Sequence, residues 1–140
     1  MIPFTNFLLE FYAADAKEAI KKIEGGQVKI AQWTTETDYR GAAKKLARIE
    51  LHDGMALDIV PYAITTYAKQ GRLRNSGKTR REVFIDIGPS RSPRRSGKVF
   101  GKAIGEGQQQ DEKIAAAKQK AIQWFQKNLG LKLGEFDFRY

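Results

Sequence analysis

The chain has 140 residues, of which 41% are hydrophobic, and its 25 basic and 16 acidic residues give a net charge of +9. This length predicts one domain that buries roughly 65–70% of its unfolded surface, and the absence of cysteine excludes disulfides and thiol chemistry. The apolar residues 3–12 include Asn6 and Glu10 and have no basic lead-in, which is atypical of a signal peptide or a membrane span. We therefore expect a soluble cytoplasmic domain with no membrane partner.

The first third of the chain predicts two strands and a short helix. Apolar residues alternate over 7–11, as in a half-buried strand. Asp15 is typical of an N-cap, and residues 16–24 have helical apolar spacing up to a Gly-Gly pair that ends the helix. Residues 27–35 favour a strand, whereas 36–45 fit either a loop or one helical turn.

Residues 46–60 predict a hairpin whose loop length follows from pairing. A two-residue turn at 53–54 would place Glu50 opposite Leu57, a charge against an apolar side chain. A three-residue loop, 52–54, pairs like with like and places Gly54 at the left-handed position that such a loop needs. The predicted pairs are Leu51 with Met55, Ile49 with Leu57, Arg48 with Asp58 and Ala47 with Ile59.

Pro61 allows a break or bend, after which residues 62–68 favour a strand. Residues 71–78 form a polar, basic stretch that predicts a loop. Residues 80–87 alternate cleanly and predict a strand with two different faces. Val83, Ile85 and Ile87 lie on one face, and Glu82, Phe84 and Asp86 on the other.

The last third predicts a loop, a strand and a long helix. Residues 88–97 contain no apolar residue except two prolines and predict a loop, while 98–104 favour a strand. Residues 109–126 predict a helix with one apolar stripe, and the irregular alternation of 131–140 fits an added edge strand. The stripe consists of Ile114, Ala117, Ala121, Ile122, Phe125 and Leu129. The fold class is α+β: a mainly antiparallel sheet of six or seven strands, a short N-terminal helix and a longer C-terminal helix.

No motif indicates catalysis. His52, the only histidine, lies in the hairpin turn and is interpreted as a solvated turn residue. Residues 71–79 resemble a phosphate loop, but five residues separate their glycines where the motif needs four, and a strand follows. The acids that could converge in a metal nuclease are Glu50, Asp58, Glu82 and Asp86. We expect a protein that is not an enzyme and that needs neither metal nor cofactor.

The net charge is concentrated in residues 69–102, which we call the basic window. It contains eleven basic and two acidic residues, whereas the other 106 residues carry fourteen of each. Such concentration predicts a partner for this region. Three interpretations compete: nucleic acid whose phosphates the cations neutralise, acidic surfaces of neighbouring copies in an assembly, and a solvated face without a partner.

The first interpretation gives a non-enzymatic nucleic-acid-binding protein that acts as a homo-oligomer and contacts DNA or RNA phosphates largely without regard to sequence. The alternative is a structural subunit, such as a virus-particle protein, whose basic arms contact neighbouring subunits or packaged genome and whose location is then the virion. The predicted contact residues are Arg72, Arg74, Lys78, Arg80, Arg81, Arg91, Arg94, Arg95, Lys98 and Lys102. The predicted stacking residues are Tyr67, Phe100 and Trp124.

Geometry divides the basic window. If the strands on either side are sequential neighbours, loops 71–79 and 89–97 lie at opposite ends of strand 80–87, roughly 25 Å apart. Glu82 and Asp86 between them repel phosphate, so two separate basic ends are favoured over one continuous groove. On the last helix, a second candidate surface places Lys113, Lys120 and Lys127 beside Trp124; we favour a core position for Trp124 and a solvated face for the lysines.

Two short segments resemble known families. Gly105-Glu106-Gly107, followed by a helix with three successive alanines, resembles the end of a double-stranded-RNA-binding domain. That family has paired lysines at the start of this helix, where this chain has Gln109 and Gln110, so the phosphate grip is absent. Residues 71–76 are similar to a segment of phage tail-completion proteins, and nothing downstream follows that pattern. Neither resemblance assigns a family.

Overall fold

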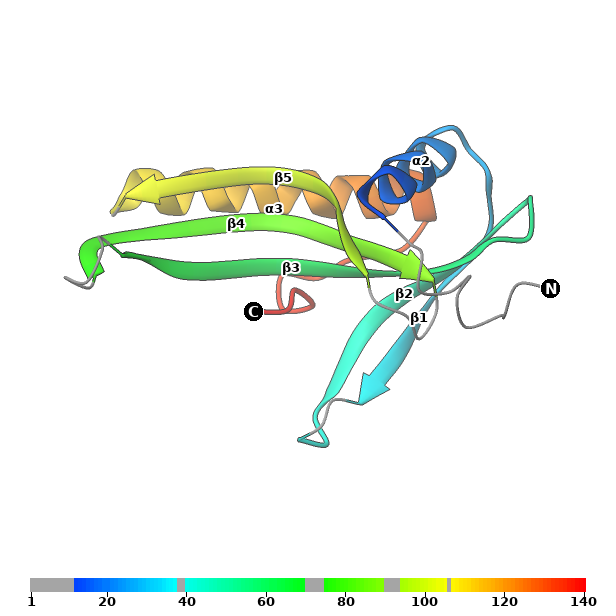
Figure 1. Ribbon diagram of the computed structural model, residues 1–140, viewed down its shortest axis with the longest axis horizontal. Coiled ribbons are helices and arrows are strands. Elements are labelled where there is room, and N and C mark those ends of the chain that lie inside the picture. The colour runs from blue at the N-terminus through cyan, green and yellow to red at the C-terminus, as the bar shows by residue number, and fades with distance from the viewer. Residues whose placement is uncertain (1–11, 38–39, 70–74, 90–93, 106) are drawn as a thin grey trace.

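The computed structural model describes residues 12–37, 40–69, 75–89, 94–105 and 107–140, without the side chains of 67–69 and 75–78. Its elements are α2 (Ala13–Glu24), β1 (Val28–Thr37), β2 (Ala43–Leu51), β3 (Ala56–Lys69), β4 (Asn75–Pro89), β5 (Arg95–Gly105) and α3 (Gln108–Leu129). The strands form one antiparallel sheet in the order β1-β2-β3-β4-β5. Both helices pack on the same face of the sheet (Figure 1). The α+β class is therefore confirmed.

The described residues form five strands, fewer than the six or seven that we expected. Pro61 does not divide a strand, because β3 continues from Ala56 to Lys69. The tail makes one parallel bridge, between Arg139 and Tyr62, and no edge strand. The strand expected at residues 7–11 lies outside the described residues.

Pro61 is accommodated because β2 has already separated from β3. The pairing of β2 with β3 ends at Ile59. Beyond it, the tail takes the vacant side, where Arg139 N–H donates to the Pro61 carbonyl (2.9 Å) and Ala63 N–H donates to the Arg139 carbonyl (2.8 Å). The N–H that Pro61 lacks would point to that same side, so no ladder bond is lost.

The predicted hairpin register is confirmed. Ala47 pairs with Ile59, Arg48 with Asp58, and Ile49 with Leu57. Leu51 N–H donates to the Met55 carbonyl at 2.8 Å and closes the three-residue loop. Gly54 has φ +90°, the left-handed conformation predicted for it.

Several element ends differ from prediction. Asp15 is not the N-cap: α2 begins two residues before it, and the Asp15 carboxylate accepts a bond from Tyr12 N–H (2.7 Å). The β4 strand extends to Asn75 and Pro89 and β5 begins at Arg95, so both expected loops are shorter. The pairing of Gly88 with Asp58 in the long β3–β4 ladder compensates for the weak strand propensity of glycine there, whereas Gly97 lies without a pairing partner at a register irregularity of β5.

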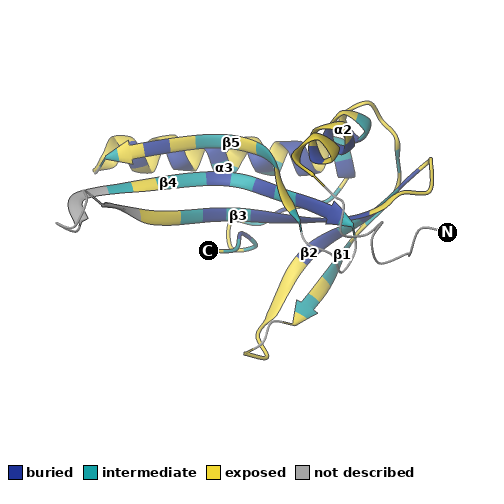
Figure 2. Ribbon diagram, viewed as in Figure 1, coloured by how far each residue is buried: buried dark blue, intermediate teal, exposed yellow. Residues whose placement is uncertain are grey.

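The main core lies between the helices and the sheet (Figure 2). The predicted faces are confirmed: Val83, Ile85 and Ile87 are buried there. All six residues of the predicted α3 stripe pack in or against this core, five of them buried and Ile122 partly buried. Helix and sheet approach closely at Gly101, where an added Cβ would lie 2.6 Å from the Ala117 Cβ.

Candidate nucleic-acid interface

The β4 strand separates the two ends of the basic window. Residues 70–74 connect β3 to β4 and residues 90–94 connect β4 to β5, so these connections lie at opposite ends of β4. The strand has fifteen residues, a length of about 45 Å at 3.3 Å per residue. The two ends of the window are thus farther apart than the 25 Å predicted from residues 80–87, and one short stretch of nucleic acid cannot contact both.

Four of the predicted contact residues form ion pairs within the chain. The distances are 3.7 Å for Arg80 to Glu82, 2.6 Å for Arg81 to Asp111, 3.1 Å for Arg94 to Glu36, and 3.2 Å for Lys98 to Glu24. Three of these carboxylates belong to α2, β1 and α3, outside the window. Because these three carboxylates neutralise cations of the window, basic residues elsewhere in the chain lose acidic counterparts, and the excess positive charge extends beyond the window.

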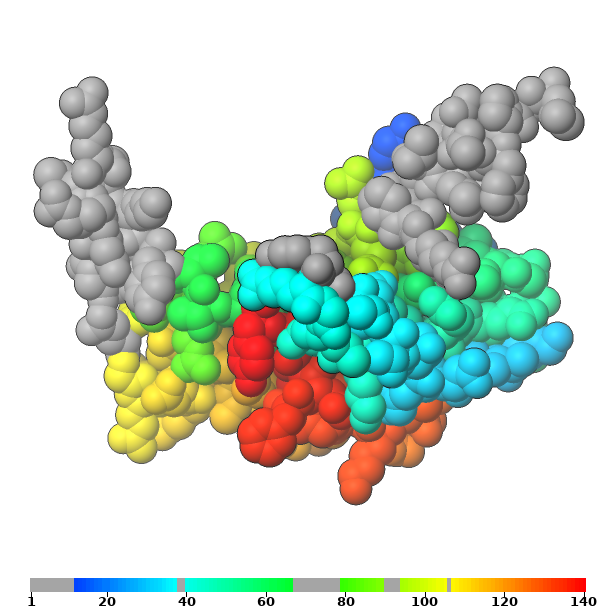
Figure 3. Space-filling view, turned by 90° about the horizontal axis from the view of Figure 1, so that it is seen from below, coloured from blue at the N-terminus to red at the C-terminus, as the bar shows by residue number. Residues whose placement is uncertain are grey.

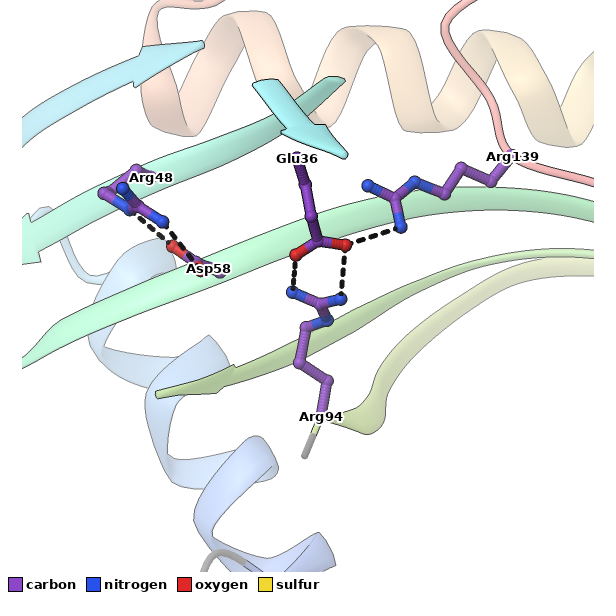
Figure 4. A network of polar contacts seen from close by, with 5 residues as sticks. All are labelled: Glu36, Arg48, Asp58, Arg94 and Arg139. Atoms are coloured by element: carbon purple, nitrogen blue, oxygen red, sulfur yellow. Dashed lines mark hydrogen bonds and ion pairs between the residues drawn. The ribbon is translucent and has the colours of Figure 1, made fainter. Parts of the chain in front are cut away.

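A polar network around Glu36 joins β1, the start of β5 and the tail (Figure 4). Arg94 donates from both terminal nitrogens to the two Glu36 oxygens at 3.1 and 3.2 Å, and Arg139 donates to Oε1 at 3.1 Å. The hydrogen bonds from Arg94, with the one from Arg139, lower the pKa of Glu36 against the opposing effect of burial. The carboxylate is therefore ionised and holds three distant segments together.

The same side of the sheet carries a second pair, Arg48 and Asp58, with two hydrogen bonds of 2.9 and 3.2 Å. Asp58 is 1% exposed, and its hydrogen bond raises the pKa of Arg48. Burial raises the pKa of Asp86, and the charge of Arg94 partly opposes this effect. Among the described residues, no three acidic or histidine side chains are placed to hold a metal ion.

The tail lies beside these groups. In the view from below, the C-terminal segment (red) lies next to the β1–β2 pair (cyan) (Figure 3). Trp33 Nε1 donates to the Lys132 carbonyl at 3.2 Å, and its ring stacks on Phe125 at 5.6 Å. Arg139 Nε and Nη2 are buried without a hydrogen-bond partner in the described structure, which makes Glu36 the main compensation for this cation.

The other predicted contact residues divide by where they lie. Lys102 is exposed and pairs in register with Glu82, and Arg95 is exposed at the start of β5. Arg72, Arg74 and Arg91 lie outside the described residues, as does the side chain of Lys78. Their contact with nucleic acid remains a prediction.

Of the aromatic residues predicted to stack on bases, Trp124 is buried and Phe100 is partly buried. Trp124 is 7% exposed and packs edge-on against Phe100 and Phe125, with centroids 6.1 and 5.5 Å apart. Phe100 is partly buried, and the side chain of Tyr67 is outside the described residues. The preference for a core position of Trp124 fits its burial. Tyr62 and Phe84, which are half-buried, instead stack on each other at 5.2 Å on the sheet face away from the helices.

Sequence reasoning missed a pocket of about 340 Å³ between the end of α2, β5 and α3. Its lining includes Glu24, Lys98, Phe100, Lys120, Trp124 and Lys127. Trp124 Nε1 donates to Glu24 at 2.9 Å, and this bond, with the nearby Lys98, lowers the pKa of the Glu24 carboxyl. The seven-residue spacing of Lys120 and Lys127 beside Trp124 indicated one side of this pocket. The contributions of α2 and β5 to its lining could not be predicted from the sequence.

Gln110, one of the two glutamines where the double-stranded-RNA-binding pattern has lysines, has a structural role; the other, Gln109, is exposed. Gln110 is 7% exposed, and its amide nitrogen donates to the carbonyls of Gly105 (2.8 Å) and Thr79 (3.0 Å). A lysine here would bury a charge, so this position ties α3 to the ends of β4 and β5 instead of facing a ligand.

The chain matches no family model, and neither a curated protein nor a solved structure shows significant similarity to it. None of the helices in the described part of the chain has the length and apolar content needed to cross a membrane.

Proposed function

We propose that this protein binds nucleic acid through phosphate contacts, without base-specific recognition and without catalysis. The observation that carries the proposal is the charge distribution: the nine net positive charges of the chain fall in residues 69–102. The strands β3 and β4 are longer than a typical strand. They separate the two basic connections of the window, while Arg80, Arg81, Lys98 and Lys102 lie along β4 and β5. Binding that releases counterions at each end requires no shaped groove.

The internal ion pairs redistribute this charge without reducing it. Glu24 and Asp111 pair with cations of the basic window, and both are neighbours of α3 or part of it. Lys113, Lys120 and Lys127 on α3 are exposed. The interface is therefore proposed to include this helix as well as the strand ends, in an oligomer whose copies contact separate backbone segments.

Salt titration tests the proposal. Fluorescence anisotropy with labelled 20-nucleotide single-stranded DNA, single-stranded RNA and duplex DNA should show affinity falling by roughly a thousandfold or more between 50 and 200 mM salt. The double variant Arg72→Gln/Arg74→Gln should reduce the logarithmic salt slope by about 2. Lys17→Gln/Lys44→Gln, with the same net charge, is the control. No binding at low salt, or binding that salt does not change, would contradict the proposal.

A second function, a subunit of a protein assembly, is favoured by the sheet edges. Within the described residues, β1 and β5 each pair on one side only. Ile30 on β1 is 48% exposed and Ile104 on β5 is 70% exposed, and apolar edge strands are sites of strand addition between chains. A discrete particle of many copies in light scattering, formed without nucleic acid, would support this function over the first.

A further inference from the structure

The pocket between α2, β5 and α3 has an excess of positive charge. Three lysines, Lys98, Lys120 and Lys127, line it together with one acidic residue, Glu24. Among the described residues, Lys120 and Lys127 form no ion pair with a carboxylate, whereas Lys98 lies 3.2 Å from Glu24. The charge of Lys127 acts on Glu24 without direct contact and contributes to its lowered pKa. An anion entering the pocket therefore meets two cations that no described ion pair occupies.

The two α3 lysines are placed to act on one group. They are seven residues apart on an α-helix, which is two turns or about 10 Å along the axis. Both line the same pocket, and lysine ammonium groups reach several ångströms on flexible stems. A phosphate between the two positions is within reach of both.

The rest of the lining consists of two aromatic residues, Phe100 and Trp124, and two amides, Gln123 and Asn128. Phe100 is partly buried, and Trp124 packs edge-on against it at 6.1 Å. The Lys98 ammonium lies 6.0 Å from the Phe100 centroid, which joins the apolar and cationic parts of the pocket. Flat apolar rings stack on such side chains, and about 340 Å³ is within the size range of small-molecule sites.

We propose that this pocket binds a nucleoside phosphate, with the phosphate between Lys120 and Lys127 and the base against Phe100. Such a ligand is either a free mononucleotide or the 5′-phosphorylated end of a strand. The proposal does not rest on nucleic-acid binding by the strand ends, because a free mononucleotide needs only this pocket. Glu24 limits the affinity, since its carboxylate repels phosphate and pairs with Lys98.

Isothermal titration calorimetry with AMP and adenosine tests the pocket. AMP should bind the wild type and adenosine at least tenfold more weakly. Lys120→Gln/Lys127→Gln should lower AMP affinity at least tenfold, and the charge-matched Lys17→Gln/Lys44→Gln should change it less than twofold. Glu24→Gln should tighten binding severalfold; Gln retains an oxygen for the Trp124 indole, so folding is preserved. No AMP binding, equal losses in both double variants, or weaker binding by Glu24→Gln would overturn the proposal.

Ten-nucleotide DNA strands that carry either a 5′-phosphate or a 5′-hydroxyl distinguish the two possible ligands, a strand end and a free nucleotide. Preference for the phosphorylated strand supports a strand end, and binding of AMP without that preference supports a free nucleotide. The hydroxyl strand also measures binding by the basic window, which Arg72→Gln/Arg74→Gln should weaken while AMP binding changes less than twofold. Loss of hydroxyl-strand binding alone would therefore contradict the proposed function and not the pocket.

Discussion

Glu36 and Glu24 are each surrounded by basic side chains, yet the two sites differ in what the cations do. At Glu36, the side chains of Arg94 and Arg139 are 16% and 14% exposed and bind the same carboxylate. At Glu24, the side chain of Lys98 is 36% exposed, and the site opens into a pocket. Glu36 is bound by two mostly buried arginines, whereas Glu24 lies at the rim of a pocket beside a partly exposed lysine.

The difference follows from the type of cation and from the segments that carry it. An arginine presents a planar fork that fits both oxygens of a carboxylate. Arg94 before β5 and Arg139 in the tail both bind Glu36 on β1, so the network fixes three segments. A lysine is a flexible point charge that exchanges one anion for another at little cost. In the basic window, a buried arginine such as Arg94 therefore stabilises the fold, whereas a partly exposed lysine such as Lys98 can bind an external anion.

The largest expected effect is on stability at Glu36. Glu36→Gln removes the carboxylate from two mostly buried arginines, which costs about 2 kcal/mol of unfolding free energy after allowance for the partial exposure of Glu36. Glu24→Gln should cost less than about 0.5 kcal/mol, because Lys98 is free to turn to water. Urea denaturation at pH 7 measures both. Equal losses would remove the distinction between the two sites.

A pH series should show the same difference. The lowered pKa of Glu36 means that its carboxylate stabilises the fold fully above the ordinary value of 4.5. This contribution is lost as pH falls through the lowered pKa of the folded state. The gap of about 2 kcal/mol between wild type and Glu36→Gln should therefore shrink to less than about 1 kcal/mol between pH 6 and pH 3. A gap that is constant or grows would show that the charge of Glu36 is not what stabilises the network.

Two basic residues four positions apart should give opposite results. Arg94→Gln should cost about 1.5 kcal/mol of stability through the Glu36 network and leave AMP binding within twofold. Lys98→Gln should change stability by less than about 0.5 kcal/mol and lower AMP affinity about threefold. Denaturation and calorimetry on the two variants make the comparison. A stability loss in Lys98→Gln as large as that in Arg94→Gln would place Lys98 in a structural role.

What the sequence could predict depended on how local the contacts are. The hairpin register followed from pairs about ten residues apart, such as Arg48 with Asp58. The Glu36 network joins residues 58 and 103 positions apart, and the bond of Trp124 to Glu24 spans 100. Charge counting identifies the basic window but not which of its members have carboxylate partners, since those partners come from elements that only the fold brings together.

The smallest effect concerns Asp86, which lies near Arg94 but outside its hydrogen bonds to Glu36. Burial raises the pKa of Asp86, so its ionised form costs stability at neutral pH, and this cost disappears as the group is protonated. Asp86→Asn should stabilise the fold by up to about 0.5 kcal/mol at pH 7, with no gain below the ordinary value of 3.8. Thermal denaturation at pH 7 and pH 3 measures this. A loss of stability at pH 7 would instead make Asp86 a second anionic partner of Arg94, so that Glu36 would not hold this arginine alone.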